Sequence, residues 1–197
     1  MPWPDDITLS GDHVTLEPLR PDHLGGMRVA AGEGGLHQLW YTTIPDAEGM
    51  EAEIDRRLAL RKAGAMLPFA VLDPAGRAVG MTTYMNIDAS LPRLEIGSTW
   101  ISRAAQRGPL NTEAKFLLLR HAFETLDCVA VEFRTHILNQ QSRRAIERLG
   151  AKQDGILRNH MRMDNGTLRD TVVYSILNTE WPMISAHLRW EMQRPRV

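Results

Sequence analysis

The sequence predicts an α+β fold in a single domain that covers residues 1–197. Two turn signals, at residues 73–76 and 164–166, lie between apolar runs and indicate antiparallel hairpins. Other segments repeat their apolar residues every three or four positions, as amphipathic helices do. Strand-like and helix-like segments therefore mix along the chain, and no internal repeat or linker divides it.

Three predicted elements precede the first hairpin. Residues 13–19 alternate apolar and polar side chains, which indicates a strand. A short helical segment opens at Pro21, and the glycine-rich residues 32–35 predict a loop. Residues 46–63 predict an amphipathic helix, because apolar residues recur at a spacing of four, and Gly64 ends it.

The first hairpin and a further strand form the middle of the chain. The hairpin joins residues 67–72 to residues 78–85, and the next strand covers residues 94–101. Gly97 within that strand indicates a bulge or the close approach of another backbone. Regular alternation would place one set of its side chains on a single face: Leu94, Ile96, Ser98 and Trp100.

Residues 110–126 are the clearest helix, because their apolar residues repeat at spacings of three and four. An Asn-Gly pair at Asn165 is a strong signal for the second hairpin. The remaining predicted elements are a strand, a helix, the two strands of that hairpin and a final helix, over residues 129–137, 139–149, 156–163, 168–176 and 179–193.

Composition excludes several classes of protein. Hydrophobic residues make up 43% of the 197 residues, and the formal net charge is −1, so no overall field attracts nucleic acid or an anionic membrane. No apolar run reaches the ~18 residues that span a bilayer. Cys128 is the only cysteine and lies in an apolar run, so we expect a buried thiol in a reducing, cytoplasmic compartment. The scattered histidines predict no metal site.

Residues 102–113 lie between a predicted strand and the clearest helix. A helix start carries about four unpaired N–H groups and a partial positive charge, which suit a phosphate. Gly108 would let a ligand approach the backbone closely, and Thr112 would add a hydroxyl donor. The local sequence supports equally well a plain strand-to-helix turn, capped by Asn111 or Thr112.

A second group of polar residues begins the next helix. Asn139 ends a predicted strand and is expected to cap that helix. Ser142 lies within the first turn, where serine has no strong structural reason to be. Arg143 and Arg144 would meet phosphates or would be solvated helix residues.

Residues 97–150 resemble the core of the GCN5-related N-acetyltransferase (GNAT) superfamily. The resemblance is carried by Glu95 to Trp100, by Gln106 to Ala114, and by the Asn139-x-x-Ser142-x-x-x-x-Glu147-x-Leu149-Gly150 pattern. It extends over nearly the whole chain and is closest to the RimJ/RimL-like branch, named for ribosomal-protein N-terminal acetyltransferases. Arg169-Asp170 and Glu180-Trp181 also match that branch.

The resemblance implies a GNAT fold, with a central mixed, mostly antiparallel sheet whose splayed strands are flanked by helices. Acetyl-CoA would lie in the gap between residues 94–101 and 129–137, with its phosphates on the loop before Leu110. The residues implied in binding it are Trp100, Ile101, Ser102, Gln106, Arg107, Gly108, Pro109, Leu110, Asn111, Thr112, Asn139, Ser142 and Arg143. A backbone N–H between Thr99 and Ile101 would polarise the thioester carbonyl.

The phosphate loop departs from the superfamily pattern, Gln/Arg-x-x-Gly-x-Gly/Ala. Pro109 replaces the central glycine and removes one N–H donor, and Asn111 replaces the last small residue. Gly108, Leu110, Asn111 and Thr112 keep their N–H groups, and we expect coenzyme A binding to survive.

The resemblance implies direct acetyl transfer to an amine, which must first lose a proton. Glu95 is the first candidate for the base and His136 the second, while a surface carboxylate and a structural histidine are the alternatives. Ile146 stands where many members have a tyrosine acid, and Ser142 is the branch's usual substitute. Asn139 completes the candidate catalytic set. Asp170 would order the acceptor site or, as the structural alternative, would pair with Arg158 or Arg169.

The acceptor is expected to be a protein N-terminus or a small amine, with no metal, nucleic acid or membrane as partner. The altered residues Pro109 and Ile146 also allow a non-catalytic coenzyme-A-binding sensor or interaction domain. A homodimer through the tryptophan-bearing C-terminal helix is a further expectation.

Overall fold

A computed structural model describes residues 3–194, so residues 1–2 and 195–197 of the predicted domain lie outside the described part. The strands are β1 (Leu9–Ser10), β2 (Thr15–Pro18), β3 (Met66–Leu72), β4 (Ala78–Asp88), β5 (Arg93–Ile101), β6 (Ala130–His136), β7 (Lys152–Arg162) and β8 (Leu168–Leu177). The helices are α1 (Leu24–Gly32), α2 (Met50–Lys62), α3 (Leu110–Glu124), α4 (Gln140–Arg148) and α5 (Trp181–Gln193).

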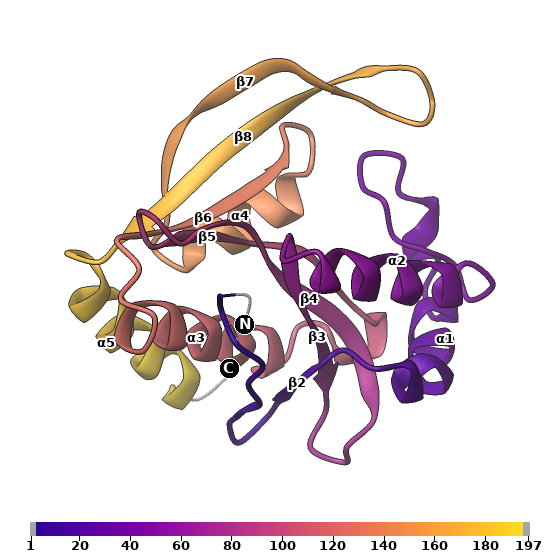
Figure 1. Cartoon of the computed structure of the whole chain (residues 1–197), viewed down its shortest axis with the longest axis horizontal. Helices are drawn as coiled ribbons and strands as arrows, with labels where there is room; N and C mark the ends of the chain where they lie inside the picture. Colours follow the sequence, from indigo (N-terminus) through magenta and orange to yellow (C-terminus); the bar gives the residue numbers. More distant parts are fainter. Residues whose placement is uncertain (1–2, 195–197) are drawn as a thin grey trace.

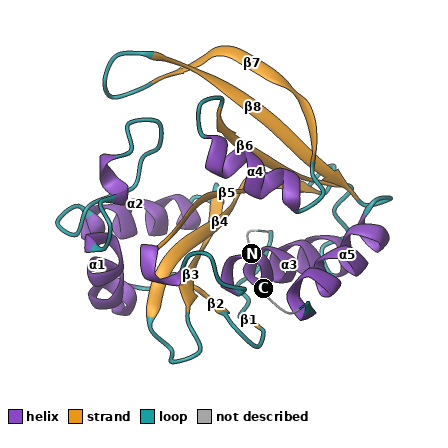
Figure 2. Cartoon of the chain, turned by 180° about the vertical axis from the view of Figure 1, so that it is seen from behind, coloured by secondary structure: helices purple, strands orange, loops and turns teal. Residues whose placement is uncertain are grey.

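One mixed sheet of eight strands organises the fold, in the order β1-β2-β3-β4-β5-β6-β8-β7. Neighbouring strands are antiparallel except β5 and β6, which are parallel and are connected through α3. Helices α1 and α2 cover one face at the β3–β4 end, and α3 and α5 cover the other face (Figures 1 and 2). The α+β fold class with a mostly antiparallel sheet is thereby confirmed.

Two hydrophobic cores lie on the two faces of the sheet. The larger core packs α3 and α5 against one face, with Phe69 of β3 and Phe133 of β6 fully or almost fully buried. The smaller core packs α1 and α2 against the other face around Met81 and Trp100. Strand β3 is buried along its whole length because both of its faces are covered.

A bulge in β5 reverses the predicted order of its faces. Thr83 pairs with Gly97 but Met81 pairs with Trp100, so β5 has one residue more than β4 between these pairs. Ser98 accommodates it with a φ of 47°. Leu94 and Ile96 lie in the larger core as expected, but Trp100 lies in the smaller core, so the regular alternation predicted for residues 94–101 is wrong beyond Gly97.

The two edges of the sheet differ from the sequence prediction: β1 was not predicted, and β7 is longer than predicted. Strand β1 is only two residues long, which is too short for an alternation to be visible. Strand β7 begins at Lys152 rather than Ile156, and most of it is exposed, so its sequence need not alternate. Hairpin β7–β8 arches away from the rest of the sheet toward the side that carries α1 and α2 (Figure 1).

Cys128 is buried, as predicted, and burial raises the pKa of its thiol to about 12. Among residues 3–194, no helix combines the length and the apolar composition that crossing a bilayer requires.

Candidate active site

The parallel strands β5 and β6 pair over only a short distance. Their partners are Arg93 with Ala130, Leu94 with Val131 and Glu95 with Glu132, and pairing stops there. Strand β5 continues to Ile101 and β6 continues to His136, while each remains paired with its other neighbour. The two strands are therefore splayed beyond Glu95, which leaves backbone edges that can accept another extended molecule.

The edge of β5 at the splay presents main-chain groups of Ile101. The N–H of Ser102 donates to the carbonyl of Val79 on β4, at 2.7 Å. Because backbone groups alternate along a strand, those of Ile101 point away from β4 toward the open edge. The Ile101 carbonyl accepts a hydrogen bond from Nε2 of Gln106, at 2.8 Å, so Gln106 ties the following loop to this edge.

The loop before α3 is shaped by Arg107 rather than by Gly108. Arg107 has a φ of 62°, in the left-handed region, whereas Gly108 does not. A Cβ added to Gly108 would meet nothing closer than the Ala105 carbonyl oxygen, at 3.9 Å. Open space therefore lies directly over the Gly108 backbone, next to the first turn of α3.

That first turn provides polar groups that fit a phosphate-bearing ligand. Leu110 begins the helix after Pro109, and its first N–H groups lack helical partners in any α-helix. The side-chain oxygen of Asn111 is buried without a hydrogen-bond partner among the described residues, but an amide oxygen accepts hydrogen bonds and therefore does not pair with a phosphate oxygen. Thr112 accepts a hydrogen bond from Arg148 of α4, at 3.3 Å, and so helps to join the two helices. Of the residues predicted to hold coenzyme A, Gly108 to Thr112 therefore lie together at the start of α3, and Thr112 joins them to α4.

Only the backbone of Trp100 can contribute to the predicted binding site for coenzyme A. Its side chain is buried in the smaller core, between the sheet and α1, with 4% of its surface exposed. The predicted role of Trp100 in binding acetyl-CoA is therefore limited to main-chain contacts.

Helix α4 begins beside the open end of β6. The side chain of Asn139 accepts a hydrogen bond from the Ser142 N–H, at 3.0 Å, which confirms the predicted cap. The hydroxyl of the half-buried Ser142 has no hydrogen bond to any described residue, so it remains available to a ligand.

Arg143 points back toward β8 instead of outward. Its Nε donates to the hydroxyl of Tyr174, at 3.0 Å, and that hydroxyl donates to Glu147, at 2.8 Å. A third bond, at 3.4 Å, joins Arg143 to the carbonyl of Ile137. Arg144 is exposed on the same helix. Most of the Arg143 guanidinium is therefore used in fixing α4 to the sheet.

Glu95 is buried at the point where β5 and β6 separate. Only 5% of its surface is exposed, and burial raises the pKa of its carboxyl group. Asn86 donates to Oε2 at 2.7 Å, and Nε of Arg134 lies 3.5 Å from the same oxygen. Gly97 leaves room for this carboxylate, because a Cβ at Gly97 would lie 2.7 Å from Oε1 of Glu95 and the side chain would have to shift. The alternative interpretation of Glu95 as a surface carboxylate is wrong.

His136 is fixed in a form that does not suit a general base. Its Nδ1 accepts a hydrogen bond from the Leu138 N–H, at 3.0 Å. The neutral ring therefore carries its proton on Nε2, and Nε2 is buried without a partner among the described residues. Burial and the charge of Arg169 lower the pKa of His136. Nε2 is consequently a hydrogen-bond donor.

The carboxylate of Asp170 forms its interactions within the β7–β8 hairpin. Its carboxylate pairs with Nε of Arg158, at 2.6 Å, and accepts a hydrogen bond from the Asn159 N–H, at 2.8 Å. The structural alternative for Asp170, pairing with Arg158, is confirmed. The sequence analysis considered Arg169 only as a partner for Asp170, and it did not consider Lys115 or Asn86, because no motif marks those two residues.

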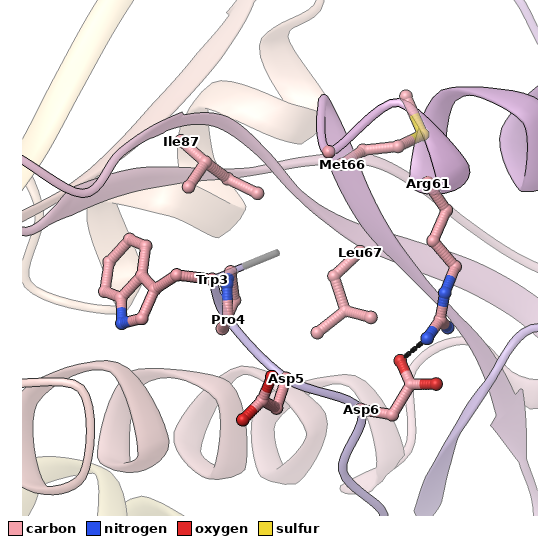
Figure 3. A pocket seen from close by; sticks show the side chains of 9 residues that line it. Trp3, Pro4, Asp5, Asp6, Arg61, Met66, Leu67 and Ile87 are labelled. Atoms are coloured by element: carbon pink, nitrogen blue, oxygen red, sulfur yellow. Dashed lines mark ion pairs between the residues drawn. The ribbon is translucent and has the colours of Figure 1, made fainter. Parts of the chain in front are cut away.

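A pocket of about 310 Å³ lies elsewhere in the molecule. It is lined by the N-terminal segment at Trp3 and Asp6 together with Arg61, Leu67 and Ile87, and an ion pair joins Asp6 to Arg61 (Figure 3). None of its lining residues belongs to the region around the splayed strands. Among residues 3–194, no group of three or more side chains is arranged to hold a metal ion.

Comparison with known proteins agrees with this geometry. Residues 13–152 match the family described as "Acetyltransferase (GNAT) domain". A crystal structure of a GCN5-related N-acetyltransferase from Brucella melitensis is 34% identical and superposes with a TM-score of 0.86, over 96% of this chain and 87% of that one. The chain therefore belongs to the GNAT acetyltransferase family, whose members use acetyl-CoA.

Two further relatives carry names from the RimJ/RimL-like branch, and they support the resemblance to it. "Putative ribosomal N-acetyltransferase YdaF" of Bacillus subtilis (strain 168) is 33% identical over 106 residues, which are 54% of this chain and 57% of that protein. Mycobacterium smegmatis RimJ, in complex with CoA-disulfide, superposes with a TM-score of 0.75 at 24% identity, over 96% of this chain and 95% of that one. The likeness to RimJ shows the shared fold.

Proposed function

We propose that this protein transfers the acetyl group of acetyl-CoA directly to a primary amine, on a protein N-terminus or on a small molecule. The observation that carries this proposal is the loss of pairing between β5 and β6 beyond Glu95 and Glu132. It supports binding of an extended pantetheine arm between the strands, with the phosphates over Gly108 and the start of α3.

Acetyl-CoA supplies an acetyl group that is activated as a thioester. A backbone N–H between Thr99 and Ile101, at the open edge of β5, would donate to the thioester carbonyl and stabilise the negative charge that develops there. The Ser142 hydroxyl, which binds no described residue, would donate a hydrogen bond to the leaving sulfur.

Glu95 would remove the proton from the attacking amine. A lysine-like amine has a pKa of ~10.4 and is mostly protonated at neutral pH. A carboxylate with a raised pKa accepts a proton more readily than an exposed one, and burial raises the pKa of Glu95. Arg134 and Asn86 hold the carboxylate in place from β6 and β4.

The direct test is release of free thiol when the purified protein receives acetyl-CoA and a panel of peptides and small amines. We expect turnover with at least one acceptor and the matching acetylated product by mass spectrometry. Tight binding of acetyl-CoA without turnover of any acceptor would contradict the proposal.

That outcome would favour the second candidate, a coenzyme-A sensor. Pro109 lacks an N–H at the phosphate loop, and Ile146 is buried in the larger core where a tyrosine acid would otherwise stand. In a sensor, Ser142→Ala and Glu95→Gln would both leave binding and regulation unchanged. We propose a cytoplasmic location for either function, in keeping with the single, buried cysteine.

The predicted homodimer stays a prediction. Trp190 and Met183 on α5 are largely exposed, which agrees with such a contact. Sedimentation of the purified protein would test it.

A further inference from the structure

The bulge in β5 places two residues of this strand opposite one residue of β4. Ser98 and Thr99 lie opposite Thr82 alone, between the paired positions on either side. The course of β5 beyond the bulge depends on how the bulge is held. That part of the strand carries the backbone N–H, between Thr99 and Ile101, that would meet the thioester carbonyl. The contacts that hold the bulge therefore bear on the proposed reaction.

A buried arginine of α2 contacts the bulge from the face of the smaller core. Nη1 of Arg57 donates to the hydroxyl of Thr83 on β4, at 2.6 Å, and Nη2 donates to the carbonyl of Ser98 in the bulge, at 3.3 Å. Nε of Arg57 pairs with Glu53 of the same helix, at 2.6 Å, so the charge has a partner. Arg57 thus joins α2 to both strands at the position where their register shifts.

A buried lysine of α3 contacts the bulge from the opposite face. Nζ of Lys115 lies 2.7 Å from the hydroxyl of Thr99 and 3.0 Å from that of Thr82, which shares its face with Tyr84 of the larger core. The two threonine hydroxyls are 2.8 Å apart, and that of Thr99 also lies 3.3 Å from the carbonyl of Gly97. Lys115 therefore fixes the bulge to β4 and to α3.

Burying two cations is a destabilising way to hold a strand. A buried charge costs free energy unless it is well paired, and apolar side chains of similar volume often give equal or greater stability. Arg57 and Lys115 are only 3% and 7% exposed, and among residues 3–194 Lys115 has hydroxyl partners but no carboxylate. A costly arrangement at a distorted strand indicates a role in function rather than in stability.

We propose that Arg57 and Lys115 are positioning residues for acetyl transfer, which hold the β5 bulge from the two faces of the sheet and so fix the direction of the backbone N–H that stabilises the thioester oxygen. This proposal rests on the function proposed above. Neither side chain contacts the acetyl group, and each acts through β5. A misdirected N–H stabilises the developing charge less well, whereas the rest of coenzyme A keeps its contacts. Loss of either cation should therefore lower kcat more than it weakens coenzyme A binding.

Lys115→Met tests the contact from α3, because methionine is similar in length but has neither charge nor N–H. We expect kcat to fall at least about tenfold, with KM for acetyl-CoA and the affinity for coenzyme A by calorimetry within about twofold of the wild type. The melting temperature should not fall, since the variant removes a buried charge. A residue with a merely structural role would lose stability together with kcat. Lys62→Met, at an exposed position, is the matched control.

A pair of substitutions at Thr99 tests the same contact from β5. Thr99→Val keeps the shape of the side chain but removes the hydroxyl that Lys115 binds, whereas Thr99→Ser keeps the hydroxyl. Thr99→Val should lower kcat about as much as Lys115→Met, and Thr99→Ser should retain most of the wild-type value. The double variant of Lys115→Met with Thr99→Val should lose little more than either alone, because both remove one contact.

Two substitutions of Arg57 test the contact from α2. Arg57→Met removes the hydrogen bonds to Thr83 and Ser98 and should lower kcat at least about tenfold. Arg57→Lys keeps a charged donor opposite Glu53, so it should retain more activity and does not depend on the folding of the methionine variant. Arg56→Met is the control, because the exposed Arg56 also pairs with Glu53 but makes no contact with the bulge.

Amide hydrogen exchange gives a readout that does not require turnover. In Lys115→Met, the amides of residues 98–101 should exchange at least about tenfold faster than in the wild type, while those of β6 should not change. If the wild-type protein acetylates no amine, the proposed function fails, and the exchange rates still decide whether the lysine holds the bulge. If Lys115→Met retains full kcat, or if these amides are unaffected, the positioning role is wrong while the acetyltransferase remains.

Discussion

The side-chain amine of Lys115, on α3, lies 2.7 Å from the hydroxyl of Thr99 at the β5 bulge, and 3.0 Å from that of Thr82. Only 7% of the Lys115 surface is exposed, and no described carboxylate pairs with it. Burial lowers the pKa of Lys115 to about 7. A lysine that sheds its charge so readily destabilises the protein at neutral pH, because the unfolded chain still binds its proton.

Lys115→Met is therefore expected to stabilise the protein at pH 7, by about 2–4 kcal/mol. The advantage should shrink as the pH rises from 7 toward 10.5, since the unfolded lysine then loses its proton too. Urea unfolding of both proteins at pH 7 and pH 9.5 checks this. A difference in unfolding free energy that does not change with pH would show that Lys115 keeps its charge when folded.

Gly108→Ala is expected to leave stability almost unchanged and to weaken coenzyme A binding about tenfold. The nearest protein atom to the added methyl group is the Ala105 carbonyl oxygen, at 3.9 Å. The methyl group nevertheless fills the space over the loop where the phosphates are proposed to lie. Calorimetry with coenzyme A gives the affinity. Gly25→Ala, where the added Cβ also meets nothing, is the control. Equal affinities for both variants would place the phosphates elsewhere.

Pro109→Ala should strengthen coenzyme A binding by severalfold, because it restores an N–H at the start of α3. Pro109 has a φ of −70°, which alanine adopts without strain. The variant should lose about 0.4–1 kcal/mol of stability, since the unfolded chain gains freedom. The same titration measures this effect, and unchanged affinity would mean that this N–H does not reach the ligand.

Ser142→Ala should lower kcat by about tenfold to a hundredfold and leave the KM values similar. The helix cap is retained, because Asn139 binds the backbone N–H of residue 142 rather than its hydroxyl. Melting temperatures should accordingly agree with the wild type. Gln141→Ala, at the exposed neighbouring position, serves as the control. Full activity of Ser142→Ala would remove the serine from the mechanism.

Glu95→Gln should abolish the acid limb of the pH–rate profile. In the wild type, kcat/KM should fall as the pH drops through the raised pKa of Glu95, because only the carboxylate accepts a proton. Glu132→Gln, which alters the neighbouring carboxylate on the same face, should keep that limb. If Glu95→Gln retains it, another group is the base.

The same pKa has a consequence for stability. Because Glu95 holds its proton more tightly when folded, its contribution to stability falls as the pH rises above 4.5 through the raised value. Glu95→Gln should remove this dependence, which urea unfolding between pH 4 and pH 7 would detect.

The elements that the sequence predicted are those with a strong local signal. Helix α3 repeats its apolar residues, and the turns at Gly76 and Gly166 each carry a glycine with positive φ. Gly97 predicted a bulge in β5, and the register shift beside it confirms that bulge. The exchange of faces beyond Gly97 was not predicted, because the alternation was continued through the bulge. Asn139 could be assigned because a cap depends on local sequence alone.

Residues of the site that come from distant segments were harder to predict. The effect of the Arg169 charge on His136 depends on the register of β8 against β6, which local sequence does not fix. The environment of Lys115 depends on how α3 packs across the sheet. Glu95 was identified through a family pattern, whereas its burial follows from strand β6 and from Asn86 on β4.

The open edges of β5 and β6 also bear on how such a protein can change over time. Contacts made by main-chain groups survive most amino-acid replacements, so mutation can alter the side chains along both strands while the acetyl donor is still recognised. The side chains on the sheet face opposite the larger core are then free to diverge, and so is the loop that carries Trp40 and Tyr41 beside His136. The same fold can in this way acquire new acceptors through successive mutations, while it continues to bind acetyl-CoA.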